Sequence, residues 1–131
     1  MGDAPGFLRG IHVLLVDDNV DAREIIASFL LHHGAHVTAA ESGAEALGLM
    51  EAVRPDVIVS DISMPGMTGH EFLQRVRTLP GEAEHPTPAI ALTILDGHRE
   101  RARQSGFQTY LVKPVDPSQV VREVARLAGL D

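Results

Sequence analysis

Residues 56–69 read DVIVSDISMPGMTG, and this stretch decides the fold. Its first half is a short run of apolar, mostly β-branched residues, which is typical of a parallel strand covered on both faces. The run ends at Asp61, and a loop with a proline and two glycines follows directly. Loop glycines of this kind usually serve turn geometry. The stretch therefore indicates an α/β protein with a polar residue at the carboxyl end of a buried strand.

The same alternation of a strand and a helix extends outward from this stretch along the chain. Five short β-like runs are each followed by residues with helical apolar spacing. The runs cover 11–16, 35–39, 56–60, 89–93 and 109–112. The run at 35–39 alternates polar and apolar residues, which is typical of a strand at the sheet edge. This order predicts one doubly wound α/β domain, with right-handed crossovers and helices on both faces of an open parallel sheet.

Capping signals predict where three of the helices begin. A serine or threonine followed three residues later by glutamate matches the reciprocal capping box, and an aspartate before proline suits a helix start. The residues are Ser42 with Glu45, Thr68 with Glu71, and Asp116 with Pro117.

Two other helices are predicted from their apolar residues. One carries Ala22, Ile25, Ile26, Phe29 and Leu30 at the spacing of a single core-facing stripe, with Gly34 placed for a left-handed C-terminal cap. The other covers 97–105, where Ala102 is the only clear apolar residue among several arginines. We expect this second helix to pack weakly and to move easily.

Composition excludes several classes of protein. The 131 residues include 11 Lys and Arg against 18 Asp and Glu, so the net charge is −7. The length suits a single domain over 1–131, and the absence of cysteine excludes disulfides, thiolate nucleophiles and cysteine-ligated metal centres. The acidic surface argues against direct binding to nucleic acid or to an anionic membrane. No signal peptide or membrane span is recognisable, so we expect a cytoplasmic protein.

Polar residues follow the predicted strands at the edge where an open parallel sheet binds its ligands. Asp17 and Asp18 end the first strand, Asp61 the third, Thr93 the fourth, and Lys113 follows the fifth. Crowded carboxylates need a hard cation or a lysine to stay ionised, and Mg²⁺ prefers such oxygen ligands. The sequence therefore predicts a magnesium site that handles phosphoryl groups.

Four strings at these strand ends resemble the receiver domain of bacterial two-component response regulators. They are VLLVDDN at 13–19, DVIVSDISMPGMTG at 56–69, ALT at 91–93 and YLVKPV at 110–115. The resemblance covers about residues 8–129. It implies a single-domain, CheY-like, flavodoxin-like fold whose five-stranded parallel sheet has the order 2-1-3-4-5.

The resemblance also implies a role for each residue. Asp61 would accept a phosphoryl group from a sensor histidine kinase or a phosphotransfer protein. Asp17, Asp18, Asp61 and the backbone carbonyl of Ser63 would hold Mg²⁺, for which Mn²⁺ could substitute. Lys113 would pair with the phosphoryl oxygens. The protein would not be an enzyme beyond its own phosphorylation and dephosphorylation.

The implied switch uses two further residues. Thr93 would bond the phosphoryl group, and Tyr110 would then turn from an exposed to a buried position. This would remodel the surface of the fourth helix, fifth strand and fifth helix for an unknown downstream protein. The chain would be a monomer or a weak phosphorylation-dependent dimer. The bond before Pro114 is expected to be cis.

Two features near the switch differ from the usual family pattern. The segment from Thr93 to Lys113 is slightly shorter, and Ile94 stands where a small residue is usual. A bulky Ile94 is expected to restrict the access of a phosphodonor or of hydrolytic water to Asp61.

Other interpretations remain open at the sequence level. The chain could be the receiver piece of a hybrid histidine kinase or a phosphorelay shuttle. A metal-dependent phosphatase with an aspartyl-phosphate intermediate is disfavoured, because Asn19 stands where that class has a second aspartate. Histidines 32, 33 and 36 could bind a metal, although Gly34 interrupts their helical spacing. The strand-end residues could also be ordinary caps, turn residues, core residues or solvated side chains.

Overall fold

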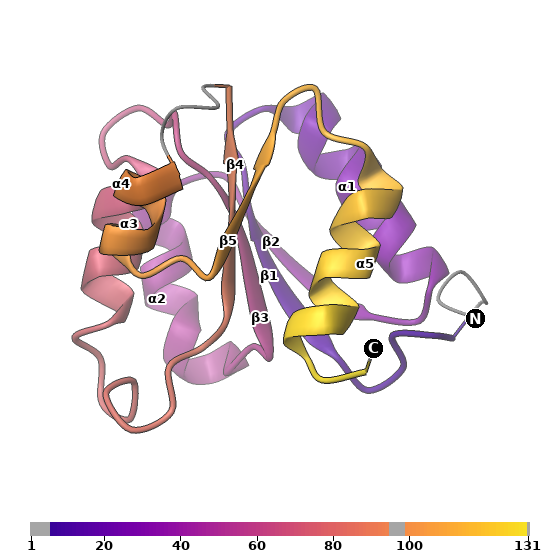
Figure 1. Ribbon diagram of the computed structural model, residues 1–131, viewed down its shortest axis with the longest axis horizontal. Helices are drawn as coiled ribbons and strands as arrows, with labels where there is room; N and C mark the ends of the chain where they lie inside the picture. Colours follow the sequence, from indigo (N-terminus) through magenta and orange to yellow (C-terminus); the bar gives the residue numbers. More distant parts are fainter. Residues whose placement is uncertain (1–5, 95–98, 131) are drawn as a thin grey trace.

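The apolar runs form one parallel sheet at the centre of the molecule (Figure 1). The computed structural model describes residues 6–94 and 99–130. The strands are β1 (His12–Val16), β2 (His36–Ala40), β3 (Val57–Asp61), β4 (Ala89–Thr93) and β5 (Thr109–Val112). Their order is β2-β1-β3-β4-β5, which confirms the predicted sheet and places β2 at an edge. The first three strands begin one residue later than predicted.

The strand order reverses between β1 and β3, because the chain first adds β2 on one side of β1 and then adds β3 on the other. Val13 lies between Val37 of β2 and Val57 of β3 in the ladder. In an open α/β sheet, the ligand site lies outside the carboxyl ends of the strands at this point of reversal. The fold therefore directs attention to the residues that follow β1 and β3.

Two apolar cores cover the two faces of the sheet. Because side chains alternate along a strand, Val13 and Leu15 enter one core, whereas Leu14 and Val16 enter the other. Helices α1 (Val20–His32) and α5 (Pro117–Leu127) cover the first core. Helices α2 (Gly43–Val53), α3 (Gly69–Val76) and α4 (Arg99–Ser105) cover the second, as Figure 1 shows. No helix in the described ranges is long and apolar enough to cross a membrane.

The helix starts agree with the capping signals, with one exception. Thr68 and Glu71 form the complete capping box of α3, and Asp116 caps α5 ahead of Pro117. Ser42 accepts the N–H of Glu45 as predicted, but the Glu45 carboxylate accepts the N–H of Glu41 and not that of Ser42. The prediction of a reciprocal hydrogen bond from Ser42 N–H to Glu45 is therefore wrong, because the Glu45 carboxylate binds the N–H of Glu41, the residue before Ser42.

The core-facing stripe of α1 is narrower than predicted. Ile26 and Leu30 are buried, but Ile25 is 52% exposed and Phe29 is 40% exposed. A helix on an open sheet touches it along a narrow line, and residues one position away lie on the flank of the helix. The prediction that all five apolar residues face the core is therefore wrong for Ile25 and Phe29. Gly34 has a φ of 95°, as expected of the left-handed end of this helix.

Helix α4 is held more firmly at one end than its apolar content predicts. Ala102 and Ser105 are its buried residues. Ser105 Oγ lies 2.8 Å from Nδ1 of the buried His70 on α3, and Arg77 Nη2 donates a 2.6 Å hydrogen bond to the carbonyl of Gly106. Polar contacts thus attach the C-terminal end of α4 to α3. The first two residues of the predicted helix, 97 and 98, lie outside the described residues.

Candidate functional site

Three carboxylates converge where β1 and β3 end. One oxygen each of Asp17, Asp18 and Asp61 lies within 4.8 Å of the others. Asp17 is fully buried and Asp61 is 3% exposed, whereas Asp18 is exposed. They meet because β1 and β3 are parallel neighbours and their carboxyl ends share one edge of the sheet. The sequence prediction that these three residues meet is thus supported by their geometry.

One oxygen of the Asp17 carboxylate lacks a hydrogen-bond donor among the described residues. Its Oδ1 accepts the N–H of Asn19 at 2.9 Å, while its Oδ2 is buried and has no hydrogen-bond partner within residues 6–94 and 99–130. A buried carboxylate oxygen without a donor is costly. Three clustered carboxylates suit a hard divalent cation, which would remove that cost. The residues present therefore fit Mg²⁺.

Lys113 reaches the same cluster from the end of β5. Its Nζ lies 2.9 Å from Asp61 Oδ1, which also accepts the N–H of Ser63 at 3.3 Å. The Lys113 side chain is 27% exposed, so it stays partly in contact with water. The Lys113–Pro114 peptide bond is cis, the form that the resemblance implies. Lys113 thus meets Asp61 across 52 residues of sequence.

The pKa of Asp61 is raised above its ordinary value. Burial of the carboxyl is the main cause, and the negative charge of Asp17 adds to it. The hydrogen bond and positive charge of Lys113 lower the pKa but do not cancel the effect of burial. A carboxylate attacks as a nucleophile only when it is ionised, so a cation in this cluster would activate Asp61.

Gly69 brings the start of α3 against the backbone of Asp61. A Cβ atom at Gly69 would lie 2.3 Å from the Asp61 carbonyl oxygen and 2.8 Å from Ile62 Cα. The expectation that both loop glycines serve turn geometry is therefore correct for Gly66, whose φ is 82°, and wrong for Gly69. Gly69 is needed because two pieces of backbone approach closely, which sequence spacing does not reveal.

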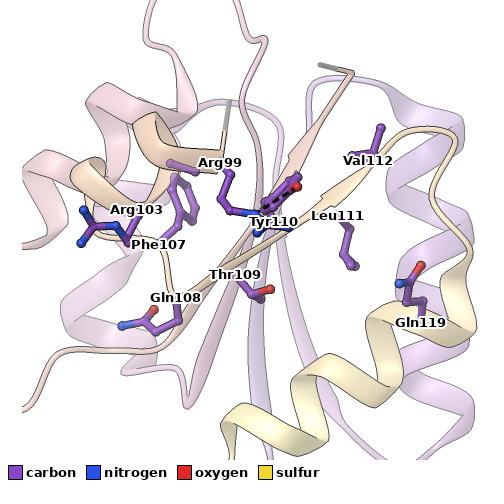
Figure 2. Close-up of a pocket in the computed structure, with 10 residues that line it drawn as sticks. Arg99, Arg103, Phe107, Gln108, Thr109, Tyr110, Leu111, Val112 and Gln119 are labelled. Carbon is purple, nitrogen blue, oxygen red and sulfur yellow. Dashed lines mark hydrogen bonds between the residues drawn. The ribbon is translucent and has the colours of Figure 1, made fainter. Parts of the chain in front are cut away.

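Thr93 and Tyr110 lie on neighbouring strands at this end of the molecule. Thr93 is buried at the end of β4, and Ile94 directly after it is 62% exposed. Tyr110 is half-buried on β5, and Arg99 of α4 lies over its ring (Figure 2). The sequence analysis assigned no role to Arg99, because no local pattern links it to Tyr110.

The structure adds a second arginine that the sequence analysis missed. Arg23 Nη1 donates a 2.7 Å hydrogen bond to the backbone carbonyl of Asp17. This contact ties α1 to the loop that carries the first two carboxylates. An arginine on the first turn of a helix has no sequence signal that distinguishes it from a solvated side chain.

Among the described residues, the clustered histidines do not come together with the geometry of a metal site. His33 is buried and its Nδ1 lies 2.8 Å from the carbonyl of Phe29, while the exposed His32 packs edge-on against it. His36 packs instead near His12 on β1. Within the part of the chain that the structure describes, the only group of three or more residues with metal-ligand geometry is Asp17, Asp18 and Asp61.

Comparison with known proteins identifies the family. The sequence matches the response regulator receiver domain over residues 13–125. The chain belongs to this family. It is a receiver domain of two-component signal transduction, and its fold is shared with CheY-like proteins of known structure.

Relatives of this receiver domain include both short and long proteins. PilH of Pseudomonas aeruginosa is 34% identical over 121 residues, which cover 89% of this chain and 98% of PilH. The sensor histidine kinase GacS of Pseudomonas protegens is 33% identical over 93% of this chain, but the match spans only 14% of GacS. Receiver domains of this kind therefore occur alone and as parts of kinases.

Two solved structures bear on the site. The receiver domain of sensor histidine kinase PA1611 from P. aeruginosa, solved with a magnesium ion coordinated in its active site cleft, is 32% identical with a TM-score of 0.81, covering 92% of this chain and 98% of that chain. The second is the receiver domain of Saccharomyces cerevisiae Ssk1, solved in complex with the histidine phosphotransfer protein Ypd1. It is 27% identical with a TM-score of 0.82, and the match covers 90% of this chain and 88% of that chain.

Proposed function

We propose that Asp61 is the phosphoacceptor of this receiver domain. The observation that carries the proposal is the placement of a buried Asp61 carboxyl 2.9 Å from Lys113 Nζ and beside Asp17, whose Oδ2 has no hydrogen-bond partner among the described residues. One oxygen of Asp61 attacks the phosphorus of a phosphohistidine, the phosphorus–nitrogen bond breaks, and the imidazole leaves with a proton. The product is an aspartyl phosphate, which water then hydrolyses.

Asp17, Asp18, Asp61 and the carbonyl of Ser63 are the residues proposed to hold Mg²⁺ or, in its place, Mn²⁺. The geometry of the three carboxylates supports this assignment, as does the magnesium ion in the PA1611 receiver. When bound, the ion offsets negative charge on the phosphoryl oxygens. Lys113 exchanges its contact with Asp61 Oδ1 for one with a phosphoryl oxygen, and so supplies a second positive charge.

The proposed output is a change of the surface formed by α4, β5 and α5. The Thr93 hydroxyl bonds the phosphoryl group, Tyr110 turns inward, and the altered surface binds a downstream protein. Thr93 is buried at the end of β4, the strand next to β3 with Asp61, and the half-buried Tyr110 lies on β5, the next strand, where it pairs with Ala91. The phosphoryl group can shift this equilibrium only through contacts that differ between the two arrangements.

An apolar surface beside the site suits the phosphodonor. A groove of about 350 Å³ is lined by Asp17 and Lys113 of the site together with the apolar Ala22, Ile25 and Pro114. Ile25 is 52% exposed. A histidine-bearing helix of a kinase or phosphotransfer protein that lies in this groove would bring its phosphohistidine to Asp61. The Ypd1–Ssk1 complex shows that a related receiver binds a protein of this class.

The first test is the intact mass of the protein after incubation with phosphoramidate and Mg²⁺. We expect one added phosphoryl group, which is absent from Asp61→Asn and from a sample with excess chelator. If Asp61→Asn gains the same mass, Asp61 is not the acceptor.

The second test addresses the phosphodonor surface. Ile25→Glu should slow phosphorylation by a phosphotransfer protein but leave phosphorylation by phosphoramidate unchanged, because only the protein donor touches the groove. Leu31→Glu, at an exposed position of the same helix, is the matched control. Equal rates for the two variants with the protein donor would contradict the proposed surface.

Two alternatives differ in how the domain is used. A receiver piece of a hybrid kinase, or a phosphorelay shuttle, would pass its phosphoryl group on to a phosphotransfer protein, and a transfer assay in that direction distinguishes them from a terminal receiver. A phosphatase is disfavoured, because the Asn19 side chain accepts the N–H of Ala22 and caps α1. We propose a single cytoplasmic domain over residues 1–131 that turns over no substrate besides its own phosphoryl group.

A further inference from the structure

Arg99 and Tyr110 join the start of α4 to β5. The guanidinium carbon of Arg99 lies 5.1 Å from the centroid of the Tyr110 ring, and Arg99 Nε donates a 3.3 Å hydrogen bond to the phenol oxygen (Figure 2). A cation at this distance over an aromatic face is attracted by the π electrons of the ring. One side chain thus makes two different contacts with the same tyrosine.

The two ends of α4 are therefore attached to different parts of the molecule. The C-terminal end is attached to α3 by the contact between Ser105 and His70 and by the hydrogen bond from Arg77 to Gly106. The N-terminal end meets β5 through Arg99 and Tyr110. Movement of Tyr110 would act on the N-terminal end of α4 and leave the C-terminal contacts in place.

We propose that Arg99 is a positioning residue that sets the balance between the two arrangements of the switch. The proposal rests on the proposed function, in which Tyr110 turns inward on phosphorylation. A contact made in only one of two arrangements favours that arrangement by the free energy of the contact. The guanidinium lies over the Tyr110 ring in this structure, and inward rotation of the ring would break that contact, so Arg99 would stabilise the arrangement that precedes phosphorylation.

Arg103 provides a matched control on the same helix. Arg99 and Arg103 both line a pocket of about 570 Å³ between α4 and β5. Arg103 pairs with Glu100 within the helix, and its side chain is 69% exposed. Substitution of either arginine removes one positive charge from this surface, but the Arg99 substitution also removes the hydrogen bond and the cation–π contact with Tyr110.

The sequence supplies a probe for the test. Tyr110 is the only tyrosine and the protein has no tryptophan, so tyrosine emission and its quenching by acrylamide report on this residue alone. The measurements are made on the full chain and on Arg99→Ala, Arg99→Lys and Arg103→Ala, before and after incubation with phosphoramidate and Mg²⁺. The rate of phosphorylation is followed by intact mass.

We expect Arg99→Ala to shift the quenching of Tyr110 before phosphorylation toward the value of the phosphorylated parent. In the proposed switch the inward arrangement is the one that reacts, so the rate of phosphorylation rises with its population. The same variant should therefore be phosphorylated about two- to fivefold faster, which matches the free energy of an exposed cation–π contact. Arg99→Lys retains a cation over the ring and should lie between the parent and Arg99→Ala. Arg103→Ala should behave as the parent in both measurements.

Three results would overturn the proposal. One is an Arg99→Ala protein whose Tyr110 quenching and phosphorylation rate both equal those of the parent. Another is an equal change in Arg99→Ala and Arg103→Ala, which would show an effect of net charge. The third is a pair of results: the parent accepts no phosphoryl group, and Tyr110 in unphosphorylated Arg99→Ala is quenched as it is in the parent. A parent that accepts none while Arg99→Ala still alters the quenching contradicts the proposed function, but supports the positioning of Tyr110 by Arg99.

Discussion

At the residue scale, Asp61 meets two opposing requirements. It is 3% exposed, which favours the neutral carboxyl, yet it must be ionised to attack phosphorus. Lys113 lies 2.9 Å away and lowers the pKa, but burial and the charge of Asp17 outweigh this effect and leave the pKa raised. Without a cation, the site is therefore a source of instability in the folded protein.

We predict that Asp61→Asn raises the free energy of unfolding of the metal-free protein at neutral pH. The folded carboxyl has a raised pKa, so the folded state binds more protons than the unfolded state between the ordinary value of 3.8 and the raised value. The parent therefore loses stability as the pH rises through that interval, whereas the amide does not titrate. Urea unfolding in chelator at several pH values measures the difference between the two proteins.

The control is Asp18→Asn, because Asp18 is exposed and its charge is solvated. Its effect on the free energy of unfolding should be smaller. A difference between Asp61→Asn and the parent that stays constant from acid to neutral pH would contradict the interpretation of the Asp61 pKa.

Ile94 provides a second prediction at this scale. It is 62% exposed and directly follows Thr93, where the sequence analysis expects it to restrict access to Asp61. Ile94→Ala should therefore shorten the lifetime of the phosphorylated form several-fold, because water reaches the acyl phosphate more easily. The decay of the phosphorylated form is followed by intact mass, with Leu31→Ala as the control for an exposed apolar residue elsewhere. Equal lifetimes of Ile94→Ala and the parent would rule out the effect.

At the scale of elements, glycines in two helices have opposite roles. Gly69 opens α3 against the Asp61 carbonyl, where an added Cβ would be 2.3 Å away. Gly48 lies within α2, and a Cβ there would meet nothing within 4 Å. Gly69 permits two segments of backbone to approach closely next to the site. Gly48 makes α2 less stable than an alanine at the same position would, because glycine loses more conformational entropy in a helix.

We therefore predict opposite effects for the two alanine substitutions. Gly69→Ala should lower the free energy of unfolding by about 2–3 kcal/mol and slow phosphorylation, because the loop that carries Asp61 must shift. Gly48→Ala should raise the free energy of unfolding by about 0.5–1 kcal/mol without affecting phosphorylation. Chemical denaturation and intact mass provide the two measurements. A Gly69→Ala protein with parental stability and rate would show that the close approach is not required.

At the scale of the whole molecule, the site depends on three strands from both halves of the chain. Asp17 follows β1, Asp61 ends β3 and Lys113 follows β5, so the site exists only when the sheet is complete. A ligand that binds the folded site and not the unfolded chain stabilises the whole protein. The net charge of −7 adds a general response to salt, which must be separated from specific binding.

We predict that Mg²⁺ at ten times its dissociation constant raises the free energy of unfolding by about 1.4 kcal/mol. Asp17→Asn should remove most of this gain, because it replaces a buried carboxylate that we propose as a ligand. NaCl at matched ionic strength is the control for screening. The same gain in NaCl, or in Asp17→Asn, would argue against a cation at the three carboxylates.

Much of the fold could be predicted from local sequence. Four of the five strands follow from nearly continuous apolar runs, whereas β2 is recognisable as an edge strand because its residues alternate. The starts of α3 and α5 follow from capping residues within three or four positions of each other. The strand-end carboxylates could be named before the structure because parallel strands end at one edge.

Other features depend on the tertiary structure alone. The exposure of Ile25 and Phe29 is set by how α1 lies on the sheet, and the role of Gly69 by its distance from Asp61. Arg99 meets Tyr110, and His70 meets Ser105, only after helices and strands far apart in the chain have packed together. Periodicity and capping act over a few residues and are visible in sequence, whereas these contacts depend on distances that only the folded chain defines.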